Sequence, residues 1–328
     1  DRNLLSFKPA SRLPESSKLY VRVKYRGKNL GETEWSVPIT FTTGHSLMGT
    51  FTQLATGPSP RLDAAGAVLN GKLYVQGGRY NNISGSMRSD LWEFTPANST
   101  WSQKSVNKSL QSHTAVAIGS LIYFLGGSTS SGGSAQVSDL WSYNPVGNVV
   151  KALAAFPKGA IVNHVAVEIA GEMYVFGGTV AGSYSDAVYK YTPVTNTWKS
   201  LGTSPSTLNG ASAAVVGKKA YIFNTGSFYC YDSEANTWAS KTLPDAVSYF
   251  YGRQLVTIDG LIYAYGGSKS STYISQLYKF EPELDEWTAL PSGGIARQGF
   301  VFATINGSAY AFGGSGYNGY LNEFWKID

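Results

Sequence analysis

One short sequence pattern recurs along this chain: a strand-like apolar run with a central tyrosine and two glycines at its end. Its first copy spans Lys72 to Gly78, with the sequence KLYVQGG. The central tyrosines of the six copies are Tyr74, Tyr123, Tyr174, Tyr221, Tyr263 and Tyr310. They lie 42 to 51 residues apart, and a near-constant period in this range indicates a protein built from copies of one supersecondary unit.

Each copy has room for four strands. A run of small and apolar residues leads into a two-residue turn, such as Asn70-Gly71, which favours the positive φ of a tight hairpin. The tyrosine strand follows, then a loop of variable length and an aromatic strand such as Ser89–Phe94. A last strand starts near a tryptophan such as Trp101. Many short strands with glycine turns, in a chain with 37 glycines and only 14% charged residues, predict an all-β protein.

The double glycine, the aromatic strand and the tryptophan that follows together resemble the kelch repeat over residues 49–328. The resemblance implies a six-bladed β-propeller with one four-stranded blade per repeat. Two repeats depart from the pattern, because Val150 stands in place of tryptophan and Asn224-Thr225 in place of the double glycine. The sixth repeat reaches Asp328 without a fourth strand, so we expect the strand at residues 50–54 to complete the last blade and remove an open sheet edge.

Residues 1–48 differ in character from the repeats. We expect strands around Tyr20–Val23 and Trp35–Thr43, joined by a polar loop, and a possible third at Leu4–Lys8. Leu13-Pro14 ahead of Tyr20 is similar to a tyrosine corner, and the whole resembles the last strands of a fibronectin type III domain. Such a domain needs about seven strands, so the resemblance implies a partial domain, with residues 44–49 as the linker to the repeats.

The charge pattern and the absence of known catalytic motifs argue against several functions. The basic excess of residues 1–48 follows one strand, which indicates a solvated face rather than a nucleic-acid surface. No apolar run has the length of a membrane span, so we expect no membrane insertion. No catalytic triad, phosphate loop or dinucleotide fingerprint occurs, and we expect no cofactor. Because the chain begins with Asp1 rather than Met, we expect a fragment or a processed product.

A metal site is also not expected. His113 and His164 occupy equivalent positions in adjacent repeats, but no Asp, Glu or Cys accompanies them at a matching position. Some kelch-type propellers are copper oxidases with a tyrosine cross-linked to a cysteine. Cys230, between Tyr229 and Tyr231, instead fits a small buried apolar residue.

Binding residues are expected on the face that carries the variable loops. These loops are rich in Ser, Gly, Asn and Tyr, the composition of adaptable binding surfaces. The five loops span residues 79–88, 128–137, 179–184, 268–273 and 315–320. The candidates on them are Arg79, Tyr80, Arg88 and Tyr317.

Counting back from each repeated tyrosine gives two further rings of candidates near the mouth of the central channel. Ten residues back lie Ala64, His113, His164, Ala211, Arg253 and Phe300, and thirteen back lie Arg61, Leu110, Ile161, Leu208, Phe250 and Arg297. The three arginines would either recognise carboxylates or sugar hydroxyls, or pair with neighbouring backbone and acids. Tyr249 and Tyr251 would stack on a sugar face.

Fibronectin-like strands ahead of a propeller resemble bacteriophage tail fibres and related attachment proteins. This implies a non-enzymatic receptor-binding module in a virion or extracellular setting. Its partner would be a bacterial surface polysaccharide or an outer-membrane protein, and its first segment would contact other virion proteins. Two alternatives stay open. One is a sugar-acid mutarotase-like enzyme using Arg253, His113, His164 and Glu168, and the other is an intracellular kelch adaptor, although no BTB-like domain is present in this sequence.

Overall fold

The computed structural model describes residues 18–24, 26–27, 31–42, 47–81, 83 and 86–328. The chain divides into two compact units, Asp1–Ser46 and Leu47–Asp328. Every regular element in the described ranges is a β-strand, as the composition predicts. No helix in those ranges is long and apolar enough to cross a bilayer.

In the first unit, β1 (Lys18–Val21) pairs antiparallel with β4 (Ile39–Thr42), and β2 (Arg26–Gly27) pairs with β3 (Gly31–Glu32). The possible strand at Leu4–Lys8 and the Leu13-Pro14 corner lie outside the described residues. The likeness of this segment to fibronectin type III therefore stays a prediction.

The second unit contains six four-stranded antiparallel sheets among its described residues, numbered here 1 to 6 along the chain. Sheet 1 has β6 (Ala65–Leu69), β7 (Lys72–Gln76), β8 (Leu91–Thr95) and β9 (Thr100–Lys104), and sheet 2 has β10 (Thr114–Ile118), β11 (Leu121–Leu125), β12 (Leu140–Asn144) and β13 (Val149–Ala152). Sheet 3 has β15 (Val165–Ile169), β16 (Glu172–Phe176), β19 (Ala187–Thr192) and β20 (Thr197–Thr203), and sheet 4 has β21 (Ser212–Val216), β22 (Lys219–Asn224), β23 (Ser227–Asp232) and β24 (Thr237–Ser240). Sheet 5 has β25 (Gln254–Ile258), β26 (Leu261–Tyr265), β29 (Leu277–Glu281) and β30 (Glu286–Leu290), and sheet 6 has β31 (Val301–Ile305), β32 (Ser308–Phe312), β35 (Phe324–Ile327) and β5 (Phe51–Gln53).

Short antiparallel strand pairs extend some of the variable loops. They are formed by β17 (Thr179–Val180) with β18 (Ser183–Tyr184), β27 (Ser268–Lys269) with β28 (Thr272–Tyr273), and β33 (Ser315–Gly316) with β34 (Gly319–Tyr320). The two-residue strand β14 (Ile161–Val162) pairs with β17.

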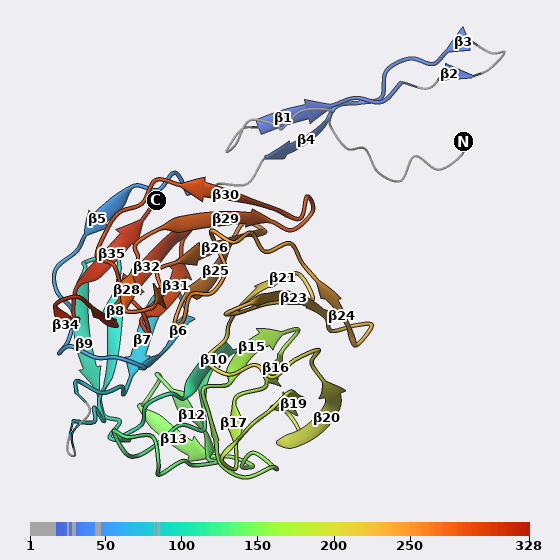
Figure 1. Ribbon diagram of the computed structural model, residues 1–328. Coiled ribbons are helices and arrows are strands. Elements are labelled where there is room, and N and C mark those ends of the chain that lie inside the picture. Colours follow the sequence, from blue (N-terminus) through green and yellow to red (C-terminus); the bar gives the residue numbers. More distant parts are fainter. Residues whose placement is uncertain (1–17, 25, 28–30, 43–46, 82, 84–85) are drawn as a thin grey trace. The chain divides into compact units, whose positions relative to one another are not determined.

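The first strands of the six sheets neighbour one another in a closed ring, with β6 beside β10 and β31, and β21 beside β15 and β25. Figure 1 shows the sheets following one another around this ring in chain order. Sheet 6 joins the two ends of the unit, because β5 pairs with β35 and places Phe51 opposite Ile327. This is a propeller-like arrangement, with first strands inside and fourth strands outside.

The core lies between adjacent sheets and is largely aromatic. Between sheets 6 and 1, the ring of Trp101 lies 5.0 Å from Phe312 and 5.2 Å from Phe324. Equivalent tryptophans in other repeats pack similarly, as Trp238 does on Phe176 at 5.6 Å. Val150, which stands where these tryptophans stand, is exposed on β13. Burial of these large rings is the main source of cohesion between sheets.

The double glycines stitch neighbouring sheets together. In each of the five, the backbone N–H of the second glycine donates to a carbonyl of the next sheet's lead-in segment, at 2.7 to 2.8 Å. The five donor–acceptor pairs are Gly78–Leu110, Gly127–Ile161, Gly178–Leu208, Gly267–Arg297 and Gly314–Arg61. A Cβ on the first glycine would lie only 2.3 to 2.8 Å from the same carbonyl oxygen, so only glycine fits there. We call this contact the glycine stitch.

The junction between sheets 4 and 5, here the 4/5 junction, has no glycine stitch. The N–H of Thr225 donates to the side-chain Oδ1 of its neighbour Asn224 instead of to Phe250. The carbonyl of Thr225 accepts from Tyr249, one residue before the usual position. The departure that the sequence places at Asn224-Thr225 therefore changes how two sheets are joined.

Candidate functional site

A cavity of about 500 Å³ lies at the start of the six first strands. All six sheets contribute to its wall, through the opening residues of β6, β10, β15, β21, β25 and β31 and the residues just before them. Polar groups on the wall include Asp63, Asn163, Asn209, Gln254 and Gln298. A wall with hydrogen-bonding groups on every side suits a polar ligand or a protruding polar segment of a partner.

A belt of backbone surrounds this cavity. It consists of the residues eleven positions before each repeated tyrosine: Asp63, Ser112, Asn163, Gly210, Gly252 and Gly299. All six have positive φ, between 52° and 67°, a conformation that Gly, Asn and Asp adopt more readily than other residues. We call these six residues the lining belt.

Hydrogen bonds link the lining belt from sheet to sheet. Ser112 N–H donates to the Asp63 carbonyl at 2.9 Å, and Asp63 N–H donates to Gly299 at 3.0 Å. The same bond joins Asn163 to Ser112, Gly210 to Asn163 and Gly299 to Gly252. Among the described residues the bond from Gly252 to Gly210 is missing, and that gap again lies at the 4/5 junction.

Arg79 and Asp63 form an ion pair on the cavity wall. The Arg79 guanidinium lies 3.2 Å from the Asp63 carboxylate, and its Nη1 donates to the Tyr320 hydroxyl at 3.4 Å. Burial raises the pKa of Asp63 and outweighs the opposing effect of Arg79. The pair fixes a cation and an anion side by side at the mouth, where a polar partner would meet both.

His113 and His164 also lie on the wall, but as neutral side chains. Burial lowers the pKa of each to about 3, and the proximity of His113 contributes further at His164. His164 Nε2 is 2.7 Å from the Thr114 hydroxyl, and the two rings pack beneath the first glycines of the stitches at Gly77 and Gly126. No three His, Cys, Asp or Glu side chains gather anywhere in the described ranges.

Exposed aromatic side chains lie on the loops around the cavity. Tyr251, 66% exposed, lines the cavity itself, and Tyr249 has the Lys269 ammonium 5.2 Å from its ring centre. Tyr317, 65% exposed, meets Tyr273 edge to face at 5.2 Å and donates from its hydroxyl to the Tyr273 carbonyl.

On the neighbouring loop of sheet 1, the Arg88 guanidinium lies 4.2 Å from the ring centre of Tyr80. Of the candidates in the sequence, the structure thus brings Arg79, His113, His164 and Tyr251 to one cavity. Tyr80, Arg88, Tyr249 and Tyr317 lie outside its wall.

Comparison with known proteins identifies the repeats. The model of the KLHDC2/KLHL20/DRC7 Kelch-repeats domain matches residues 112–294. The chain belongs to this kelch-repeat family. Kelch-like protein 25 of Xenopus tropicalis is 25% identical over 251 residues, which cover 72% of this chain and 41% of that protein. Human Kelch-like protein 23 is 26% identical over 233 residues, 67% of this chain and 39% of that protein.

The chain thus spans about two fifths of the length of the curated relatives it matches. A solved structure, described as the structure of YjhT, superimposes with a TM-score of 0.69 over 82% of this chain and 96% of that one. At 17% identity the likeness shows a shared fold. The all-β, kelch-repeat, propeller-like fold is therefore confirmed for this kelch domain.

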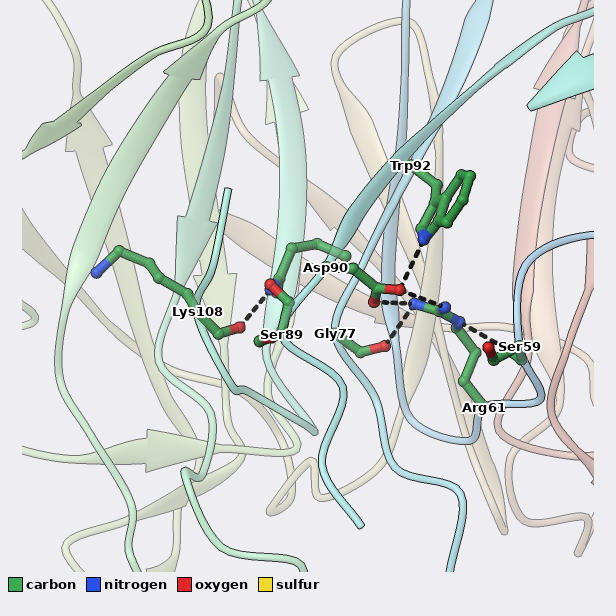
Figure 2. A network of polar contacts seen from close by, with 8 residues as sticks. Ser59, Arg61, Gly77, Ser89, Asp90, Trp92 and Lys108 are labelled. Atoms are coloured by element: carbon green, nitrogen blue, oxygen red, sulfur yellow. Dashed lines mark hydrogen bonds and ion pairs between the residues drawn. The ribbon is translucent and has the colours of Figure 1, made fainter. Parts of the chain in front are cut away.

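Two arginines expected at the channel mouth hold the kelch domain together instead. Figure 2 shows the Arg61 guanidinium between Asp90, the Gly77 carbonyl and the Ser59 carbonyl. Its Nη1 and Nη2 donate to the two Asp90 oxygens at 2.8 and 3.1 Å, and Trp92 Nε1 donates to the same carboxylate. Arg297 donates to the carbonyls of Gly313, Glu323 and Ile295.

Arg253 is a third correction. It is 1% exposed and does not line the cavity, and its Nε donates to the Gly266 carbonyl at 3.1 Å. Each of the three guanidinium groups donates to the carbonyl of the first glycine in the double glycine of its own sheet, which gives that carbonyl a donor. Of the two alternatives for these arginines, the structural one therefore describes Arg61 and Arg297.

Sequence reasoning missed most of the polar wall. Five polar residues of the wall each lie one position away from a member of the two candidate rings: Asp63, Asn163, Asn209, Gln254 and Gln298. The recurrence of Asp, Ser, Asn or Gly eleven residues before each tyrosine is the signal that marks the lining belt. Glu168, the candidate acid, is absent from the wall and accepts from the Gly171 N–H at the far end of its strand.

Proposed function

We propose that this kelch domain is a non-enzymatic recognition module that binds another macromolecule at the face where the cavity opens. The observation that carries the proposal is the cavity itself, whose wall offers polar groups from all six sheets beneath loops with exposed tyrosines. Tyrosine rings give large contact area at low entropy cost, and Asn and Gln side chains hydrogen-bond adaptably.

The chemistry of the wall supports binding rather than catalysis. Its one carboxylate among the described lining residues, that of Asp63, is paired with Arg79, and both histidines are neutral and packed. A mutarotase-like reaction would need positioned acid and base groups facing the ligand. Glu168 and Arg253, two of the four residues assigned to that alternative, do not line the cavity.

We further infer that the six four-stranded sheets are the blades of a six-bladed propeller, closed by β5 in the last blade. The pairing of β5 with β35 and the ring of first strands support this. The first segment would be a partial fibronectin-like module that joins the kelch domain to the rest of an attachment structure. Its β1–β4 pairing is compatible with that role.

For the partner, we propose a bacterial surface glycan bound by a virion or extracellular protein. Exposed Tyr251 and Tyr317 rings on the loop face support a sugar ligand, because flat aromatic faces stack on sugar rings. A protein partner is the second candidate, which the likeness to kelch-like proteins favours.

The test is a comparison of the full chain with Tyr251→Ala and Tyr317→Ala variants on glycan arrays and on bacterial cells. Tyr20→Ala, an equally exposed tyrosine in the other unit, is the matched control. We expect binding to fall at least roughly tenfold in the loop variants and to be unchanged in the control. Binding to no glycan and no cell, together with capture of a protein by the same face, would replace the glycan proposal with the protein one.

A further inference from the structure

The lining belt is open at one place, between Gly210 of sheet 4 and Gly252 of sheet 5. At the other five junctions the belt N–H of one sheet donates to the belt carbonyl of the sheet before it, at 2.9 to 3.3 Å. Among the described residues, the Gly252 N–H has no acceptor and the Gly210 carbonyl has no donor. The chain of hydrogen bonds around the cavity therefore leaves one acceptor and one donor unused, on neighbouring sheets.

These two unused groups can be reached from the cavity. Gly210 and Gly252 both line it, and Gly210 is exposed. Neither residue has a side chain to cover its backbone, and Gly299 continues the bare backbone into sheet 6. A glycine backbone allows a ligand to approach closely enough to hydrogen-bond with it.

Side chains beside the gap also have unused hydrogen-bonding groups. Ser212 and Gln254 occupy the same position, nine residues before the repeated tyrosine, and both line the cavity. Ser212 is 6% exposed, and its hydroxyl has no partner among the described residues. In sheet 2 the same position holds Thr114, whose hydroxyl lies 2.7 Å from His164 Nε2. Buried polar groups without a partner are rare in folded proteins, and one on a cavity wall indicates a place for a ligand.

The wall beside the gap is otherwise small and uncharged. Ala211 and Ala213 of sheet 4 and Leu255 of sheet 5 line the cavity there. The described lining residues of sheets 4 and 5 include no charged side chain. A charged ligand group would lose its hydration at this wall without gaining a counter-ion, whereas a methyl group would gain apolar contact. The chemistry therefore favours a neutral group with a small apolar end.

A secondary amide has the donor and the acceptor that the gap needs. In a trans amide the N–H and the C=O point in opposite directions, so the group can donate on one side and accept on the other. Placed between Gly210 and Gly252, it continues the chain of N–H···O=C bonds around the belt. A hydroxyl can make the same two bonds, but it has no apolar end for the alanines beside them.

We propose that the open pair of the lining belt binds the acetamido group of an N-acetylated amino sugar in a glycan. The acetamido N–H donates to the Gly210 carbonyl, its carbonyl accepts from the Gly252 N–H, and its methyl group contacts Ala211. The sugar ring packs on Tyr251, which is 66% exposed and precedes Gly252 on the cavity wall. A cavity of about 500 Å³ has room for such a unit. This inference rests on the proposed recognition role of the cavity and adds the class of sugar that it selects.

The test is an NMR titration of the isotope-labelled full chain that follows the Gly252 amide. The probes are N-acetylglucosamine, N-acetylgalactosamine and N-acetylmannosamine, each beside its parent hexose, and N-acetyl-alanine methylamide as a peptide probe. Gly210→Asn places a side chain in the gap, where an added Cβ meets nothing within 4 Å, and Asn163 shows that asparagine adopts the belt conformation. Gly119→Asn is the matched control, with φ of 60° against 67° and equally open space, in the turn at the far end of β10.

We expect at least one N-acetylated sugar to shift the Gly252 amide resonance and to slow its hydrogen exchange, while the parent hexose does neither. Gly210→Asn should raise the dissociation constant of that sugar roughly tenfold or more, and Gly119→Asn should leave it unchanged. If Gly210→Asn does not fold, the comparison of each sugar with its parent hexose in the wild type still decides.

Three results would overturn the proposal: an equal response to the parent hexoses, a response to the peptide probe alone, or no response of the Gly252 amide to any sugar. If Tyr251→Ala still abolishes binding to cells or glycan arrays while the Gly252 amide responds to no N-acetylated sugar, the recognition role stands and this proposal fails. A Gly252 response to an N-acetylated sugar in a chain that binds no cell and no glycan array leads to the reverse conclusion.

Discussion

The 4/5 junction and the other five junctions of the kelch domain join neighbouring sheets through different hydrogen bonds. At the five, a glycine stitch and a lining-belt bond tie each sheet to the next. At the 4/5 junction both of these bonds are missing among the described residues. A shifted bond from the Tyr249 N–H to the Thr225 carbonyl and the aromatic rings around Arg253 join the sheets instead. Two backbone links of the regular pattern are thus absent at one place, and one irregular backbone bond replaces them.

The comparison teaches that a ring of sheets does not need every backbone link. Aromatic packing continues across the 4/5 junction, where Phe228 of sheet 4 lies 4.9 Å from Phe280 of sheet 5. Since burial of such rings supplies most of the cohesion, the stitches add order and exact spacing rather than the bulk of the stability.

The largest expected effect comes from removing the acid of a buried arginine. Asp90→Ala leaves the Arg61 guanidinium buried without its carboxylate, and we expect a loss of about 3 to 5 kcal/mol in the free energy of unfolding. Gln276→Ala, the equivalent change in sheet 5, should cost less than about 1.5 kcal/mol because no ion pair is broken. Urea unfolding measures both, and equal losses would remove the distinction between the junctions.

Adding a Cβ to a glycine of a stitch should lower the free energy of unfolding somewhat less than Asp90→Ala does. In Gly126→Ala the new carbon would lie 2.3 Å from the Ile161 carbonyl oxygen, on a backbone with φ of 63°, so we expect a loss of about 2 to 3 kcal/mol. Asn224→Ala, at the same place in sheet 4, should cost under about 1 kcal/mol. The same urea experiment decides, and a tolerated alanine at Gly126 would contradict the steric account of the stitch.

Hydrogen exchange should show a smaller, local difference. The amides of Gly127 and Ser112 donate across junctions, whereas that of Gly252 has no described acceptor. We expect Gly252 to exchange at least roughly tenfold faster than the two donors under native conditions. Measurement by NMR or mass spectrometry checks this, and equal protection would mean that the 4/5 junction is as firmly linked as the rest.

The smallest expected effect is on pH dependence. Burial alone would raise the pKa of Asp90, but the hydrogen bonds and charge of Arg61 hold it below its ordinary value of 3.8. A depressed folded-state pKa stabilises the protein above pH 3.8, and this contribution is lost as the pH falls through the folded value. The difference in unfolding free energy between wild type and Asp90→Asn should therefore shrink between pH 5 and pH 3. A constant difference over that range would exclude the pair as its source.

Much of the fold was predictable because its signals are local. The tyrosine strands and double glycines depend on side-chain alternation and on a special backbone conformation, which a sequence pattern records directly. The same pattern located Asn224-Thr225 as the exception. It did not reveal the consequence, since a hydrogen bond to Phe250 involves a residue that is distant in sequence.

The site was less predictable because long side chains turn to whatever partner is nearest. Arg61, Arg253 and Arg297 were expected at the channel mouth from backbone position alone, yet a guanidinium reaches several ångströms in either direction. Their partners, Asp90 and the carbonyls of Gly77, Gly266 and Gly313, become neighbours only in the folded sheets. Short side chains such as that of Asp63 stay near their backbone position, so the lining belt could have been found from spacing.

The pairing of β5 with β35 also dictates an order of events in folding. Five sheets consist of strands that are close together in the chain, so each can assemble as soon as its own repeat has been synthesised. Sheet 6 cannot, because Phe51 must wait for Ile327 at the opposite end of the unit. Contacts between such distant residues form slowly, and an edge strand left unpaired meanwhile is open to wrong partners. The pairing of β5 with β35, which completes the last sheet, should therefore be the rate-limiting step of folding and the step most exposed to misassembly.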